Sequence, residues 1–137
     1  MNREKRYPIV LAHGIARFDV SWERLVDLDN QDDPFLDFFH YFRGIRTSLM
    51  RDGFSVYHSG VPWAERVDRR AEQLRKNIAA VLDQTAAEKV NIIAHSMGGL
   101  DARHMLFGDR NKGKIHQRVA SLTTIGTPHH GTAFADE

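Results

Sequence analysis

The sequence predicts an α/β fold in which one parallel sheet of about four strands is flanked by helices. Two observations carry this prediction. Short apolar runs rich in β-branched residues alternate along the chain with segments of helical periodicity, and each run stops at a glycine or at polar turn residues. Such runs are typical of parallel strands, which are buried on both faces. At 137 residues, the chain has the length of about one domain.

The strand pattern occurs in four segments, which are residues 9–12, 54–58, 90–94 and 119–125. Because helical segments separate them, we expect parallel pairing with right-handed crossovers. The first run is continuous and apolar, and two-sided burial is expected of the strands in general. In a partial fold, the strand over residues 119–125 would lie at an open edge of the sheet.

Helical periodicity is clearest over residues 64–87, where apolar side chains recur at steps of three, four or one. Arginine and lysine side chains, Arg70 among them, are expected on the opposite, solvent-facing side of this helix. A shorter helix is expected over residues 42–52, with Gly53 at the position that stops it. Another is expected to begin directly after Ser96 and to end near Gly108.

Residues 17–41 form a long connection that holds several aromatic side chains, Trp22 among them. Connections of that length are usually functional or contain small helices of their own. These aromatic residues fit either a ligand cavity or a short helix packed on the sheet edge, and we favour the second.

Composition excludes several classes of protein. The 19 Lys and Arg residues nearly balance the 18 Asp and Glu residues, which argues against a nucleic-acid partner. The absence of cysteine excludes a disulfide scaffold and a Cys-based zinc site within this sequence. No metal site or cofactor is expected in this portion. No apolar run approaches the ~20 residues of a membrane span. Because the first residues lack a signal-peptide pattern, we expect a cytoplasmic protein.

The segment that carries chemistry is residues 91–100, Asn-Ile-Ile-Ala-His-Ser-Met-Gly-Gly-Leu. A strand runs directly into Ser96, and a helix follows at once. This is the nucleophile-elbow pattern G-x-S-x-G, with Ala94 in place of the first glycine. Small residues flank the serine because its strained turn leaves no room for larger side chains. The alternative is a serine in an ordinary glycine-rich turn. The residues expected to support the elbow are Ala94, His95, Gly98 and Gly99.

A second motif, residues 10–15, lies at the end of the first strand. Acyl transfer needs two hydrogen-bond donors for the tetrahedral oxyanion. One is expected to be the Met97 backbone N–H, directly after the serine, and the other the Ile15 N–H. Gly14 would allow this loop to approach closely. For His13 we favour a structural role, as a histidine bonded to local backbone, over a catalytic one.

These motifs resemble the bacterial triacylglycerol lipases and related esterases of the α/β-hydrolase fold. The similarity covers essentially the whole chain in family order, over residues 7–14, 41–45, 71–74, 89–103 and 121–132. It implies Ser96 as the nucleophile and the Ile15 and Met97 amides as the oxyanion hole. It also implies the sheet order second–first–third–fourth strand. The sequence departs from the family pattern at Ala94 and at Arg17, where many members carry glycine.

The resemblance further implies that residues 1–137 are the N-terminal portion of a single α/β-hydrolase domain. In the family, the triad Asp or Glu and His follow the fourth strand, as do the lid and the calcium ligands of calcium-dependent members. A partial fold without its C-terminal half is therefore expected. His129 and His130 follow the fourth strand and are candidates to line the cleft, although a turn-stabilising role is favoured. His95 adjoins the serine but is expected to face another way.

The leading hypothesis is a serine-dependent carboxylic ester hydrolase that forms an acyl-Ser96 intermediate on lipid-like esters. Transient contact with a lipid interface is part of this expectation. An acyltransferase or thioesterase uses the same elbow, and a non-catalytic fragment or pseudoenzyme without the triad Asp and His is the alternative from another class. A binding module that uses residues 22–42 as a hydrophobic patch is the weakest alternative.

Overall fold

The computed structural model describes residues 6–16, 40–62, 65–108 and 113–133. In chain order, the elements are β1 (Ile9–Ala16), α1 (His40–Arg51), β2 (Val56–Pro62), α2 (Val67–Thr85), β3 (Val90–His95), α3 (Met97–Gly108), the short 3₁₀ helix η4 (Ile115–Arg118) and β4 (Val119–Ile125). The aromatic residues expected to pack on the sheet edge, Trp22 among them, and Arg17 lie outside the described residues.

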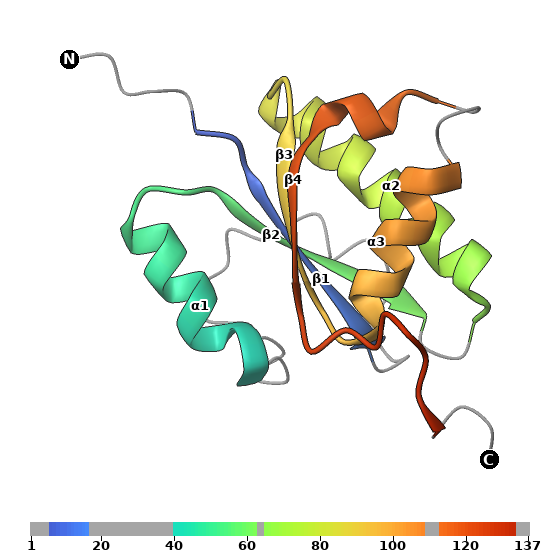
Figure 1. Cartoon of the computed structure of the whole chain (residues 1–137). Coiled ribbons are helices and arrows are strands. Elements are labelled where there is room, and N and C mark those ends of the chain that lie inside the picture. The colour runs from blue at the N-terminus through green and yellow to red at the C-terminus, as the bar shows by residue number, and fades with distance from the viewer. Residues whose placement is uncertain (1–5, 17–39, 63–64, 109–112, 134–137) are drawn as a thin grey trace.

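The four strands form one parallel sheet in the order β2-β1-β3-β4, as the resemblance implied. Figure 1 shows α1 on one face of this sheet and α2 and α3 together on the other. This arrangement confirms the expected α/β-hydrolase architecture, with strands alternating with helices and helices on both faces. No helix of the described residues is both long and apolar enough to cross a membrane.

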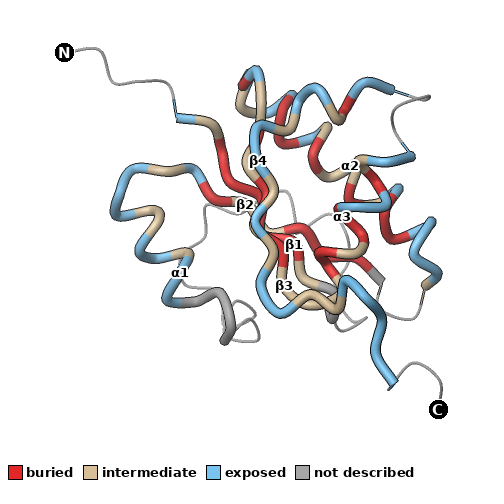
Figure 2. Tube along the Cα trace, in the orientation of Figure 1, coloured by how far each residue is buried: buried red, intermediate tan, exposed pale blue. Residues whose placement is uncertain are grey.

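The core is divided by the sheet because successive strand residues point to opposite faces. Val10 and Ala12 of β1 belong to the larger cluster, which α2 and α3 cover. Ile9 and Leu11 belong to a smaller cluster on the other face, against Leu49 of α1. Figure 2 shows that the buried residues lie mainly along β1, β2 and β3 and along α2 and α3. The first half of β1 is therefore packed on both faces.

The strand expected over residues 54–58 has different bounds in the structure, because β2 begins at Val56 and continues to Pro62. Gly60 and Pro62 have low strand propensity, so the local residue pattern did not predict this extension. Pairing with β1 overrides that propensity, with His13 opposite Gly60 and Ala16 opposite Pro62. Proline is tolerated there because β2 is an edge strand.

Two-sided burial, which is expected of the strands in general, does not hold for β4. This strand is the other edge of the sheet, and most of its side chains are partly or fully exposed. Its bounds nevertheless agree with the sequence prediction. Ile125, at its end, is 40% exposed.

The helix ends follow local rules. The last turn of α1 is closed by bonds from the Gly53 N–H to the Met50 carbonyl and from the Phe54 N–H to the Leu49 carbonyl. Gly53 has a φ of +86°, so the predicted glycine stop is confirmed. Helix α2 ends at Ala86, which also adopts the left-handed conformation, with a φ of +51°.

Candidate active site

Ser96 lies at the junction between β3 and α3 and has a φ of +53°. This left-handed conformation is uncommon and strained for a residue other than glycine, and it persists only where the surrounding structure holds it. The Ser96 N–H donates to the Ile125 carbonyl at 2.9 Å, and the Gly99 N–H donates to the Ser96 carbonyl at 3.1 Å. The strand–serine–helix turn that the motif predicts is therefore present.

Gly98 allows α3 to approach the backbone of β1. A Cβ atom at this position would lie 2.9 Å from the Ala12 carbonyl carbon and 3.3 Å from the His13 nitrogen, with the Ala12 oxygen closer still. Ala94, in place of the usual glycine, is fully buried in the larger cluster. These small residues let the start of α3 lie directly over the end of the sheet.

Gly99 packs against Thr127 in the turn after β4. A Cβ atom on Gly99 would lie 2.7 Å from Thr127 Cγ2 and 2.9 Å from Thr127 Cβ. The start of α3 is thus enclosed between β1 on one side and this turn on the other.

We expect Gly99→Ala to destabilise the fold by about 2 kcal/mol, because overpacking forces a side-chain or backbone shift. Thr127→Gly removes the obstructing atoms, so the double variant should be more stable than the sum of the two single effects by about 1 kcal/mol. Urea unfolding of the four proteins of the cycle measures this coupling. Strict additivity would show that the two residues do not contact each other.

The expected oxyanion donors, the Ile15 and Met97 N–H groups, come shortly after two residues that are paired across neighbouring strands. His13 and His95 are partners across the β1–β3 ladder, and Ile15 and Met97 each lie two residues beyond this pair at the same edge of the sheet. The β1–β2 register is irregular between His13 and Ala16, so the regular ladder is interrupted around Gly14 and Ile15. Interruptions of this kind occur next to active sites, where they redirect backbone groups.

His13 and His95 stack on one another, with their ring centroids 5.4 Å apart. His58 of β2 lies near His13. Because side chains alternate between the two faces along a strand, His13, His58 and His95 point to the α1 side of the sheet, as Leu11 and Ile93 do. The stack gives His95 a packing role in this structure.

The pKa of His58 is lowered from 6.5 to about 4, first by burial and then by the positive charges of Arg46 and His13. Between pH 4 and 6.5, His58 is therefore protonated in the unfolded chain and neutral in the folded protein. Stability contributed by neutral His58 is complete above pH 6.5 and is lost as the pH falls toward 4, by roughly 3 kcal/mol at most.

We expect His58→Gln to flatten the dependence of the unfolding free energy on pH between 6.5 and 4. The matched control is His130→Gln, because His130 is exposed in the turn after β4 and should leave this dependence unchanged. Urea titrations at several pH values measure both variants. Equal acid sensitivity of His58→Gln and the parent would contradict the assignment.

His129 has both ring nitrogens engaged. Nδ1 lies 2.9 Å from Arg103 Nη1, and Nε2 lies 3.0 Å from Thr124 Oγ1. Because an arginine guanidinium only donates, Nδ1 accepts and the Nε2–H donates to the threonine. His129 thus joins β4, the following turn and α3, an arrangement that fits the favoured turn-stabilising role.

One buried polar contact was missed by sequence reasoning. Arg70 was expected on the solvent-facing side of its helix, but its side chain is 9% exposed and its Nε donates to Asp101 Oδ1 of α3 at 2.9 Å. The spacing contained a signal, because Arg70 precedes Leu74 and Ile78 at steps of four along the buried stripe. Among the described residues, no group of three or more potential ligands is arranged to hold a metal ion.

The chain is similar to several known proteins. The family model described as "PGAP1-like alpha/beta domain" matches residues 54–137. A triacylglycerol lipase of Vibrio cholerae serotype O1 is 39% identical over 97% of this chain and 36% of its own length. One from Pseudarthrobacter phenanthrenivorans is 38% identical over 96% of this chain and 36% of its own length. Triacylglycerol lipase 2 of Saccharomyces cerevisiae is 33% identical over 94% of this chain and 48% of its own length.

The chain thus spans about a third of the length of the bacterial relatives it matches. Among solved structures, the mature form of a Bacillus licheniformis lipase superposes with a TM-score of 0.66 at 21% identity, over 95% of this chain and 44% of that one. This likeness shows a shared fold and agrees with a partial α/β-hydrolase domain. The chain belongs to the PGAP1-like alpha/beta domain family.

Proposed function

We propose that the protein carrying this chain is a carboxylic ester hydrolase with Ser96 as its nucleophile. The observation that carries the proposal is the left-handed backbone of Ser96 between β3 and α3. A strained conformation at a strand-to-helix turn presents the hydroxyl above the sheet edge, where the helix N-terminus favours negative charge. The matching relatives are named triacylglycerol lipases, which supports lipid esters as the substrate class.

In the proposed reaction, Ser96 Oγ attacks the ester carbonyl carbon while its proton passes to a general base. The carbonyl oxygen becomes an oxyanion, which accepts hydrogen bonds from the Ile15 and Met97 N–H groups. The bond to the alcohol then breaks and the alcohol leaves with that proton. Water, deprotonated by the same base, then attacks the acyl-serine. The bond to Ser96 Oγ breaks, the base returns the proton to Oγ, and the acid is released. Because backbone supplies both donors, the side chain of Met97 is not needed for this step.

We infer that the general base, and the acidic residue that orients it, are not among the residues that the structure describes. The engagement of both His129 nitrogens and the stacking of His95 on His13 support this inference. This chain then supplies the nucleophile and the oxyanion hole, and expressed alone it should hydrolyse p-nitrophenyl esters very poorly. Oxyanion donors without a base retain only a small part of the catalysis.

A fluorophosphonate probe tests the proposal, because it modifies only an activated serine. In the protein that carries this chain, mass spectrometry should locate the adduct on Ser96, and Ser96→Ala should abolish it. The control is Ser55→Ala, which changes an exposed serine between α1 and β2 and should leave labelling unchanged. Absence of labelling at Ser96 would favour a pseudoenzyme. Labelling with slow hydrolysis but rapid transfer to an added alcohol or thiol would favour an acyltransferase.

A further inference from the structure

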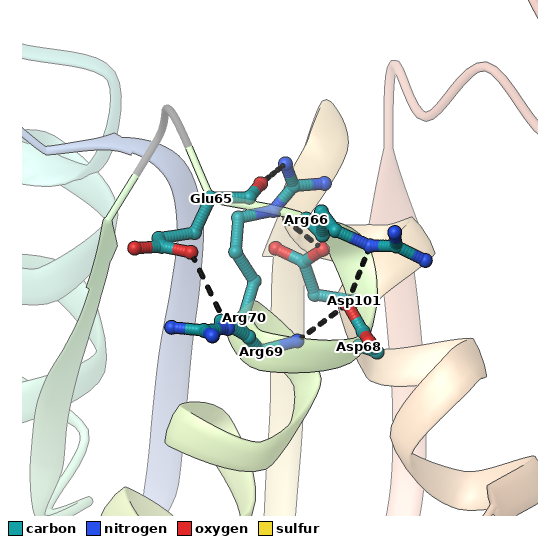
Figure 3. Close-up of polar contacts among 6 residues, drawn as sticks. All are labelled: Glu65, Arg66, Asp68, Arg69, Arg70 and Asp101. Carbon is teal, nitrogen blue, oxygen red and sulfur yellow. Dashed lines mark hydrogen bonds and ion pairs between the residues drawn. The ribbon is translucent and has the colours of Figure 1, made fainter.

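A buried ion pair joins the two helices on one face of the sheet. Arg70 of α2 and Asp101 of α3 are 9% and 1% exposed, and Arg70 Nε donates to Asp101 Oδ1 at 2.9 Å. Arg70 Nη1 also donates to the Glu65 carbonyl at 2.8 Å. Figure 3 shows Arg70 between Asp101 and the backbone of Glu65. One guanidinium therefore links the segment before α2, α2 itself and α3.

This pair differs from the charged contacts around it. Arg66 lies 3.4 Å from Asp68, and Arg69 lies 3.8 Å from Glu65, with all four side chains largely exposed. Exposed pairs of this kind contribute little to stability. They cannot fix the position of a helix, because both partners remain free to rotate into water.

Stability alone is a poor explanation for the buried pair. Desolvation of two charges offsets most of their attraction, and apolar residues of similar volume often replace such pairs without loss of stability. Burial raises the pKa of the Asp101 carboxyl, and Arg70 acts against that rise. Asp101 Oδ2 has no hydrogen-bond partner among the described residues. The ion pair differs from an apolar pair in the geometry it imposes. The N–H donors of arginine lie in one plane, so its hydrogen bonds fix the orientation of the two helices, whereas apolar contacts have no preferred direction.

The position of α3 matters most at its first residue. Asp101 is five residues after Ser96 and lies near the start of α3, the helix that begins directly after this serine. The contacts of Gly98 and Gly99 with Ala12 and Thr127 prevent α3 from moving toward β1 or toward the turn after β4. Those contacts exclude movement in two directions but do not hold the helix from the α2 side. Arg70 provides a directed bond from that side.

We propose that Arg70 and Asp101 are positioning residues that hold α3, and through it the strained backbone of Ser96, in the conformation needed for acyl transfer. The catalytic part of this proposal rests on the function proposed for Ser96. The structural part, that the pair restrains the start of α3, holds independently of that function. The two parts call for separate measurements.

The test uses the protein that carries this chain and two variants. Arg70→Met/Asp101→Leu replaces the pair by apolar side chains, and Arg70→Lys keeps the charge but not the two simultaneous, planar contacts. Three quantities are measured for each: the thermal midpoint, kcat and KM for p-nitrophenyl butyrate, and hydrogen exchange of peptides covering residues 96–102. The control is Arg69→Met, because Arg69 is exposed and forms a longer ion pair.

We expect the double variant to unfold within a few degrees of the parent, yet to lose about tenfold in kcat with KM changed less than twofold. Exchange over residues 96–102 should be about tenfold faster, whereas Arg69→Met should match the parent in all three quantities. Arg70→Lys should show the same kinetic pattern in weaker form, and it provides the test if the double variant does not fold.

A folded double variant with parental kcat and parental exchange over residues 96–102 would overturn the proposal, as would a fully parental Arg70→Lys. Faster exchange in a protein whose Ser96 is never labelled by the fluorophosphonate would retain the restraint on α3 and reject the function proposed for Ser96. Parental exchange in the variants of a labelled, active protein would reject the restraint and retain the function.

Discussion

Replacing Ser96 by alanine is expected to reduce ester hydrolysis by roughly 10⁶-fold, the loss found when the serine of a catalytic triad is removed. The change deletes one hydroxyl and keeps Cβ, so the bond from the Ser96 N–H to the Ile125 carbonyl remains. The thermal midpoint should stay within a few degrees of the parent. Turnover of p-nitrophenyl butyrate, measured together with that midpoint, separates lost chemistry from lost folding.

Ser96→Gly sharpens this first prediction. Glycine adopts positive φ without the steric conflict of a Cβ atom, so it should relieve the strain at +53° and stabilise the protein by about 1 kcal/mol relative to Ser96→Ala. Both variants should be equally inactive. More than a tenth of parental turnover in either variant would show that another group is the nucleophile, and a glycine variant less stable than the alanine variant would contradict strain at this residue.

Gly98→Ala is expected to have the largest effect on stability, at least about 3 kcal/mol. The added Cβ would meet backbone atoms of Ala12 and His13 in a strand that is paired on both sides, so no side-chain rotation can make room for it. Either α3 moves away from β1 or β1 is displaced from the sheet. Both movements would change the distance between the Met97 and Ile15 N–H groups, the proposed oxyanion donors. The rate of ester hydrolysis should therefore fall even where the variant still folds.

The matched control for this second prediction is Gly108→Ala. It makes the same change at the last residue of the same helix, where an added Cβ has nothing within 4 Å. Alanine also has the higher helix propensity, so this variant should match or slightly exceed the parent in stability. Urea unfolding measures both, and equal stability of the two variants would contradict the close approach of α3 to β1.

Much of the fold could be predicted from local pattern. The bounds of β4, the glycine stop of α1 and the start of α3 after Ser96 each follow from a short stretch of residues. The extension of β2 through Gly60 to Pro62 did not, because it depends on pairing with β1, which lies more than forty residues earlier in the chain. Local propensity carries no information about such a partner.

Prediction of the candidate site was uneven for the same reason. The elbow sequence predicted a strained serine and close-packed glycines, since steric limits act between neighbours in the chain. The partners of those glycines, Ala12 and Thr127, come from distant segments. The prediction that Arg70 faces solvent was wrong, because a charged side chain was assumed to be exposed. Its buried carboxylate partner, Asp101, belongs to another helix and could not be identified from the local pattern.

The central claim is that Ser96 attacks an ester carbonyl whose developing oxyanion is held by the Ile15 and Met97 amides. The most direct measurement is a crystal structure of the fluorophosphonate adduct in the protein that carries this chain. We expect a bond from Ser96 Oγ to phosphorus and a phosphonyl oxygen about 2.7–3.1 Å from both amide nitrogens. An adduct on Ser96 whose phosphonyl oxygen is bound by other donors, with either amide facing away, would contradict it.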